Sequence, residues 1–234
     1  MKHAIVPLFC LLMLSKIGRS FTPRFKPVNP RQEELIRLIR SRDTPIIVAV
    51  GSPGTGKSLL ACQEALHHLH QKKIRKMVLT RPTITVDGEE LGYLPGSLET
   101  KMSPWIRPLF DCLQDSDERS RVQKLVREGV IEICPLAFMR GRTFRDSFII
   151  LDEAQNTTPL QMKMALTRIG PESKMIITGD LGQSDLGNQN GLRDFVDRLS
   201  ATEPMIDGVG MVRFSDQDIL RHPVIEKILA LYRQ

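Results

Sequence analysis

The sequence predicts an α/β fold in which helices flank a parallel β-sheet. The first observation is that short apolar runs alternate with stretches of helical periodicity, as in successive βαβ units. The second is a glycine-rich turn at residues 51–58, which lies between such a run and a helical stretch. The third is a buried-strand pattern that ends in two acids, Asp152 and Glu153. The expected strands span residues 45–50, 77–80, 130–134, 147–153, 174–178 and 211–214.

The glycine-rich turn reads Gly-Ser-Pro-Gly-Thr-Gly-Lys-Ser and fits the Walker A pattern G-x-x-x-x-G-K-[S/T] without a mismatch. Its backbone N–H groups and the positive end of the following helix suit a polyphosphate. We expect Lys57 to reach the β- and γ-phosphates and Ser58 to ligate Mg²⁺. The turn therefore predicts a P-loop NTPase that binds ATP with Mg²⁺. The candidate nucleotide-binding residues are Gly51, Ser52, Pro53, Gly54, Thr55, Gly56, Lys57, Ser58 and Leu59.

The acid pair fits the Walker B position, because ligands of open α/β sheets bind at the carboxyl ends of the strands. We expect Asp152 to belong to the Mg²⁺ shell and Glu153 to polarise the attacking water. A solvated acidic strand end is the alternative. Gln183 follows the strand at 174–178 and could contact the γ-phosphate or orient the water.

Four helices are expected besides these strands. An amphipathic helix at residues 31–42 has Asn29 as its cap and Pro30 at its first position. The other expected helices are 57–71, 159–169 with Thr158 as its cap, and 222–232. A long insert at 83–128 separates the second and third strands, and Trp105–Phe110 within it predicts a short helix.

Length and composition indicate one globular domain. The chain has 234 residues, 41% of them hydrophobic, and a net charge of +6. Residues 1–32 contain six basic residues and no acid, so the remaining residues balance at 27 basic and 27 acidic. The net charge alone therefore does not argue for a nucleic-acid partner. The four cysteines are widely spaced, which indicates buried thiols rather than a zinc site or a disulfide framework.

The first residues resemble a targeting segment. Residues 1–20 combine Lys2 with a short apolar run and read as a signal peptide, and residues 21–28 form a basic, acid-free stretch typical of transit peptides. This division leaves 29–234 as the ATPase domain. It predicts import into a plastid by the secretory route, with no stable membrane insertion after removal of the leader. A cytoplasmic protein with a misassigned start or a bacterial extension is the alternative.

Several further motifs resemble the PhoH family of ATPases over residues 29–233. The family resembles the first RecA-like domain of superfamily 1 helicases, which implies a RecA-like parallel sheet. By this resemblance Gln32 reads adenine, Asp152 and Glu153 belong to an Asp-Glu-Ala-Gln box, and Gln183 belongs to a Gly-Asp-x-x-Gln sensor. The residues that carry the resemblance are Leu79–Pro82, Leu91–Gly96, Met139–Thr143, Ile149–Thr158, Gly179–Asp180 and Arg221–Pro223.

The resemblance implies a Mg²⁺-dependent ATPase and raises the prospect of coupling to RNA or single-stranded nucleic acid. A non-catalytic nucleotide switch that recruits a partner and a small-molecule kinase are the alternatives. Two-domain helicases complete their site with an arginine from the second domain, which this chain has no room for. We therefore expect a ring, a hexamer, in which a neighbour supplies that arginine. Arg221 is the first candidate, and Arg140 and Arg142 are the others.

Overall fold

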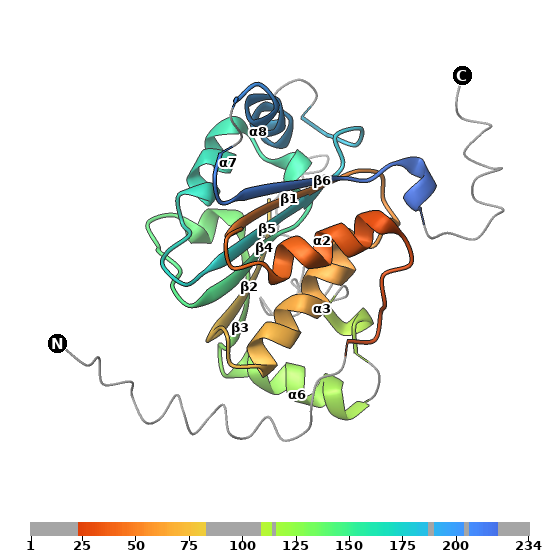
Figure 1. The fold of residues 1–234 in the computed structure, drawn as a ribbon. Helices are drawn as coiled ribbons and strands as arrows, with labels where there is room; N and C mark the ends of the chain where they lie inside the picture. Colours follow the sequence, from red (N-terminus) through yellow and green to blue (C-terminus); the bar gives the residue numbers. More distant parts are fainter. Residues whose placement is uncertain (1–22, 83–108, 114–115, 187–189, 204–205, 220–234) are drawn as a thin grey trace.

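The fold is a parallel six-stranded sheet covered by helices on both faces (Figure 1). It is seen in a computed structural model that describes residues 23–82, 109–113, 116–186, 190–203 and 206–219. The strand order is β3-β2-β4-β5-β1-β6. The strands are β1 Ile46–Val50, β2 Lys76–Arg81, β3 Ile131–Pro135, β4 Ser147–Leu151, β5 Lys174–Gly179 and β6 Val209–Arg213.

The helices are α2 Pro30–Arg40, α3 Lys57–His70, α6 Ser116–Arg127, α7 Pro159–Leu166 and α8 Gly191–Ser200. Three 3₁₀ turns complete the described elements: η1 Leu136–Met139, η2 Ala154–Asn156 and η4 Asp216–Asp218. Figure 1 shows α2, α3 and α6 on one face of the sheet and α7 and α8 on the other. This arrangement confirms the predicted α/β class.

Alternate side chains of a strand point to opposite sides of the sheet. Because helices cover both sides, side chains on both faces of the strands are buried. Ile47 and Ala49 of β1 pack toward α2 and α3, whereas Val48 packs in the cluster beneath α7 and α8. Phe148 and Ile149 of β4 divide in the same way. Parallel strands that are covered on both faces have continuous apolar runs in their sequence. This pattern explains why all six strands could be predicted.

Most of the expected helices also lie where their caps predict. The Asn29 side chain accepts from the Gln32 backbone N–H, with Pro30 at the first position of α2. Thr158 forms a capping box with Gln161 at the start of α7, where Pro159 is the first helical residue. Two helices were not predicted, α6 inside the insert and α8, whose cap is Asn190. Residues 1–20, most of Trp105–Phe110 and the expected helix at 222–232 lie outside the described residues.

The chain just before α2 is held against the helical layer. The side-chain amide of Gln63 on α3 accepts from the Phe25 N–H at 2.7 Å and donates to the Phe25 carbonyl at 2.9 Å. The Arg24 side chain also donates to the Leu113 carbonyl at 3.3 Å, so the predicted basic linker contacts the domain from Arg24 onward. Among the residues described, no helix is both long and apolar enough to cross a membrane.

Candidate nucleotide-binding site

The phosphate loop runs from β1 into α3 and requires glycine at two positions. Gly51 has a φ of 148°, and a Cβ there would lie 2.5 Å from the Phe214 carbonyl oxygen. Gly56 has a φ of 84° directly before α3, and a Cβ there would lie 3.1 Å from the Gln32 amide nitrogen. Left-handed backbone at these positions favours glycine. The loop therefore adopts a turn that directs the first N–H groups of α3 toward an anion.

Lys57 lies folded over this loop. Its Nζ donates to the carbonyls of Gly51 at 2.7 Å and Ser52 at 2.8 Å, and to the Thr55 hydroxyl at 3.0 Å. Burial lowers the pKa of Lys57, and the nearby carboxylates, Asp180 foremost, oppose that shift. An ammonium held by neutral carbonyls can exchange them for phosphate oxygens, whose charge makes stronger hydrogen bonds.

Asp152, directly after β4, forms hydrogen bonds with side chains from α3, β5 and β2. Its Oδ1 accepts from Ser58 Oγ at 2.6 Å and from Thr178 Oγ1 of β5 at 2.5 Å. Its Oδ2 accepts from Nε of Arg81 at 2.9 Å and from Nη2 of the same side chain. Only 2% of Asp152 is exposed. The two side chains predicted to bind the metal, 94 positions apart in the chain, are thus in direct contact.

Glu153 stands beside this cluster in a strained backbone conformation. Its φ of 55° is left-handed, which is uncommon for a residue with a side chain. The carboxylate is exposed and accepts from Nε2 of Gln155 at 2.6 Å, while Oε1 of Gln155 accepts from the Asp180 N–H at 3.1 Å. Gln155 therefore ties the proposed water-polarising acid to the end of β5. An exposed acid next to a buried one can meet water that the buried one cannot.

Three further residues belong to the site without having been predicted as site residues: Gln155, Thr178 and Arg81. Gln155 belongs to the same motif as the acid pair, so the motif could have indicated that Gln155 lies at the site. Thr178 and Arg81 are polar residues near the ends of apolar strands β5 and β2. Their roles depend on β2 and β5 both being neighbours of β4, which the sequence order does not reveal.

The roles of the remaining predicted residues stay predictions. Gln183 is exposed in the turn after β5, where its backbone N–H donates to the Asp180 carbonyl at 3.3 Å. Arg142 pairs with Glu132 through two hydrogen bonds of 2.6 and 2.8 Å, whereas Arg140 is exposed. Arg221 lies outside the described residues.

Gln32 lies against the phosphate loop rather than in open space. It is 3% exposed, its Nε2 donates to the Thr55 carbonyl at 3.0 Å, and its Oε1 accepts from the Val28 N–H at 2.9 Å. Both ends of the amide are therefore engaged by the protein in this structure. Nε2 keeps a second N–H and Oε1 a second lone pair beside these bonds, and the reading of adenine by Gln32 stays a prediction.

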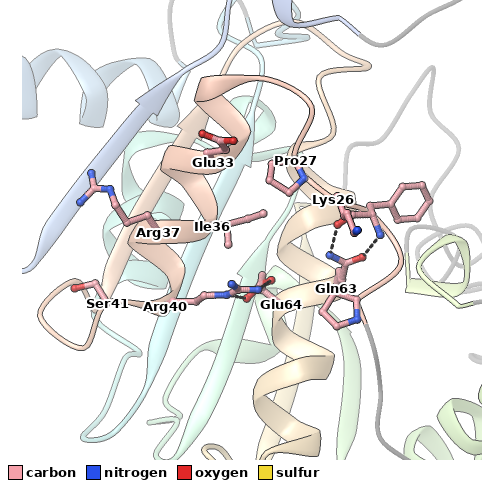
Figure 2. Close-up of a pocket in the computed structure, with 11 residues that line it drawn as sticks. Lys26, Pro27, Glu33, Ile36, Arg37, Arg40, Ser41, Gln63 and Glu64 are labelled. Carbon is pink, nitrogen blue, oxygen red and sulfur yellow. Dashed lines mark hydrogen bonds and ion pairs between the residues drawn. The ribbon is translucent and has the colours of Figure 1, made fainter.

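One cavity is lined by residues of the phosphate loop, and a second lies away from the loop. One of about 260 Å³ opens at the carboxyl ends of β5, β1 and β6, where Gly51, Asp180 and Phe214 line it and Ser52 Oγ donates to Asp216 at 2.7 Å. The other, of about 820 Å³, lies between residues 23–27, α2 and α3 (Figure 2). In Figure 2 Arg40 of α2 reaches across to Glu64 of α3, and no residue of the phosphate loop lines that cavity.

The donor set fits a magnesium ion bound together with phosphates. Mg²⁺ takes hard oxygen ligands and is usually held by one or two side chains plus the phosphates of a nucleotide. The Ser58 hydroxyl and the Asp152 carboxylate are oxygen donors that already touch, and Lys57 lies one residue from Ser58. The phosphate loop, this oxygen pair and the sheet topology together define a P-loop NTPase domain.

The chain belongs to the PhoH-like protein family, whose model matches residues 24–233. The PhoH-like protein of Bacillus subtilis (strain 168) is 46% identical over 203 residues, which cover 86% of this chain and 61% of that protein. Protein PhoH of Escherichia coli (strain K12) is 37% identical over 211 residues, covering 88% and 58%. This chain thus spans about six tenths of the length of these curated relatives.

Solved structures agree on the fold. The large terminase of a thermophilic bacteriophage superposes with a TM-score of 0.53 over 89% of this chain and 51% of that one, at 11% identity. At this identity the likeness concerns the fold alone. It agrees with the RecA-like parallel sheet that the resemblance to the PhoH family implied.

The predicted plastid location is wrong. The matched relatives are bacterial proteins, from Bacillus subtilis, Mycobacterium, Escherichia coli and Synechocystis, and bacterial cells contain no plastids. The prediction rested on the charge and apolar content of residues 1–28. Composition of that kind indicates a leader only weakly, because basic and apolar residues also occur together in ordinary N-terminal segments.

Proposed function

We propose that the protein is a Mg²⁺-dependent ATP hydrolase. The observation that carries this proposal is the 2.6 Å contact between Ser58 of the phosphate loop and Asp152, with Glu153 next in the chain. A phosphate-binding turn, a metal-binding pair and an exposed carboxylate are the three parts that hydrolysis of a γ-phosphate needs. A site for nucleotide binding alone needs no exposed acid beside the metal pair.

Each residue has a distinct task in the proposed reaction. The N–H groups of the phosphate loop and Lys57 bind the β- and γ-phosphates, which fixes the phosphoryl group in line for attack. Ser58 and Asp152 would hold Mg²⁺, which supplies charge neutralisation on the phosphate oxygens when bound. Glu153 accepts a proton from the attacking water, and Gln155 orients the Glu153 carboxylate through its 2.6 Å hydrogen bond.

Two other activities use similar sites and define the test. A nucleotide switch would bind ATP without releasing phosphate, and a small-molecule kinase would transfer the phosphoryl group to an added acceptor. Phosphate release from ATP by the wild-type protein is measured in the presence of Mg²⁺ and in the presence of EDTA. Lys57→Ala, which is expected to bind ATP poorly, is the control. The proposal expects Mg²⁺-dependent release of inorganic phosphate that Lys57→Ala loses. Tight ATP binding with no release at any Mg²⁺ concentration would favour the switch instead.

Coupling to RNA or single-stranded nucleic acid is a further part of the proposal, and it is supported only by the resemblance to helicase-like motor domains. The same assay with a single-stranded RNA tests it. A coupled enzyme releases phosphate faster when RNA is present, and the gain weakens as salt increases because phosphate contacts are screened. An unchanged rate over a range of RNA lengths would limit the proposal to the uncoupled ATPase.

A further inference from the structure

Arg81 binds the carboxylate that is expected to hold the metal ion. It is the last residue of β2, and Asp152 follows β4 directly, so the two side chains leave neighbouring strands at the same edge of the sheet. The backbone confirms the proximity, since the Asp152 N–H donates to the Thr80 carbonyl at 2.9 Å. The Arg81 side chain is 19% exposed and that of Asp152 is 2% exposed. The pair is therefore largely shielded from water.

The hydrogen-bond capacity of Asp152 is fully used. A carboxylate offers about four lone-pair sites, two on each oxygen. Ser58 and Thr178 take those of Oδ1, and Nε and Nη2 of Arg81 take those of Oδ2. A metal ion can therefore bind this carboxylate only if one of these donors leaves. Ser58 is itself an expected metal ligand, so its departure from Asp152 is no obstacle.

Of the three side chains that donate to Asp152, only Arg81 is charged, so a bound metal ion would repel Arg81 most strongly. Mg²⁺ and a guanidinium at one buried carboxylate are like charges a few ångströms apart, where the low dielectric strengthens their repulsion. We propose that Arg81 is a positioning residue that competes with the metal ion for Asp152 and keeps metal affinity low until nucleotide phosphates arrive. This inference rests on the proposed metal site of the ATPase.

The repulsion between Arg81 and the metal ion affects the order in which metal and nucleotide bind. Metal alone would gain two protein oxygens against the repulsion of the Arg81 guanidinium, whereas a metal that arrives with a nucleotide also brings phosphate ligands. The structure thus favours loading of the metal–nucleotide complex over loading of free metal. Removing the guanidinium should lift this restriction and let a free divalent ion bind.

The chain offers a matched control pair. Arg40 and the fully buried Glu64 make two hydrogen bonds of 2.7 and 2.8 Å between α2 and α3, as Figure 2 shows. As in the pair of Arg81 and Asp152, an arginine donates two hydrogen bonds to a buried acid, here to both carboxylate oxygens, and Glu64 has no predicted metal role. Arg40→Ala therefore reproduces the loss of an arginine from a buried acid without touching the proposed metal site.

The test measures Mn²⁺ binding to the full chain without nucleotide, by electron paramagnetic resonance of the free ion. Wild type, Arg81→Ala, Arg81→Lys and Arg40→Ala are compared. We expect Arg81→Ala to bind Mn²⁺ about 5- to 50-fold tighter, which corresponds to roughly 1 to 2.4 kcal/mol for a shielded pair. Arg81→Lys should lie between wild type and Arg81→Ala, and Arg40→Ala should match wild type.

A second readout covers loss of folding. In metal-free buffer Arg81→Ala should melt below wild type, because a buried carboxylate loses its partner, and Mn²⁺ should raise its melting temperature more than that of wild type. Equal Mn²⁺ affinity and equal melting shifts in Arg81→Ala, Arg81→Lys and wild type would overturn the competition. A gain in Arg40→Ala as large as in Arg81→Ala would also overturn it.

Asp152→Asn separates this inference from the proposed function. If Asp152→Asn abolishes Mn²⁺ binding in the wild-type and Arg81→Ala backgrounds, the metal site stands and the comparison of Arg81 variants judges the competition alone. If Asp152→Asn leaves Mn²⁺ binding unchanged in both backgrounds, the metal site itself is misplaced, and both the site and the competition fail.

Discussion

At the scale of single residues, the site consists of groups that would meet the nucleotide and groups that hold them. Lys57 and Ser58 belong to the first kind, and Gln155 and Thr178 belong to the second. The second kind is buried and fixed by packing, because Gln155 is 3% and Thr178 is 1% exposed. Such support keeps a catalytic group in one orientation at little entropic cost during the reaction.

Lys57→Ala should weaken ATP binding by about 10- to 100-fold, the usual worth of hydrogen bonds to a charged group. The physical reason is the loss of the ammonium that folds over the phosphate loop. Equilibrium titration with a fluorescent ATP analogue measures it. Lys73→Ala, which changes an exposed lysine just after α3, is the control, and equal affinities of the two variants would contradict the role of Lys57.

Gln155 gives a prediction that distinguishes positioning from binding. Gln155→Glu keeps an acceptor for the Asp180 N–H but removes the donor that Glu153 receives. We expect kcat to fall by about tenfold or more, since misplacing a general base costs part of its roughly 10²–10⁴ contribution. The KM for ATP should stay within a factor of about two, because Gln155 touches no expected phosphate contact. A raised KM with unchanged kcat would place Gln155 in nucleotide binding instead.

At the scale of elements, the carboxyl ends of β1, β2, β4 and β5 bring together residues that are far apart in the chain. The strands themselves were predictable, because buried parallel strands leave continuous apolar runs. Helix α8 was missed, because its cap Asn190 and first residue Gly191 read as a turn. The contact of Arg81 with Asp152 was not predictable either. It requires β2 rather than β3 to lie next to β4, a choice that tertiary packing makes.

Glu132 of β3 is bound by Lys76 of β2 at 2.6 Å and by Arg142 of the following loop. The hydrogen bonds from Arg142, with help from Lys76, lower the pKa of Glu132 from 4.5 to about 2. A carboxyl with a lowered pKa in the folded state stabilises the fold above its unfolded pKa and loses that contribution as the pH falls toward the folded pKa.

Glu132→Gln should therefore lower the free energy of unfolding at pH 7 by about 1–2 kcal/mol, less than the full shift implies because the pair is partly solvated. The difference from wild type should shrink as the pH falls from about 4.5 toward 2. Urea unfolding across this range measures it. Glu34→Gln, which removes a surface pair with Arg31, should stay near zero throughout, and a Glu132→Gln difference that grows with acid would contradict the assignment.

At the scale of the whole molecule, the question is which cation besides Lys57 and Mg²⁺ would stabilise the phosphoryl group. Arg81 is already engaged by Asp152, so it does not supply a charge to the phosphoryl group in this arrangement. We propose a ring, a hexamer, in which an arginine from the neighbouring copy completes each site. An arginine supplied in this way can raise kcat by about 10³–10⁵. Arg221 remains the first candidate, because Arg142 is paired with Glu132.

Mixing two inactive variants tests this sharing. Lys57→Ala and Arg221→Ala are each expected to be inactive alone. Mixed rings contain some sites with an intact phosphate loop from one copy and an intact arginine from the next, so phosphate release should partly recover. Size-exclusion chromatography with light scattering verifies the ring size, and co-purification of the two variants through different affinity tags verifies the mixed rings. A fully active monomer, or verified mixed rings with no recovery, would reject the shared site.

The most direct test of the ATPase assignment is Glu153→Gln, measured for ATP binding and for single-turnover phosphate release in the same preparation. The change keeps the shape of the side chain and removes its ability to accept a proton. Glu172→Gln is the control, because Glu172 is also exposed and has the same φ of 55°. The account predicts unchanged ATP affinity with phosphate release slowed by about 10²–10⁴. Release at the wild-type rate by Glu153→Gln would contradict it.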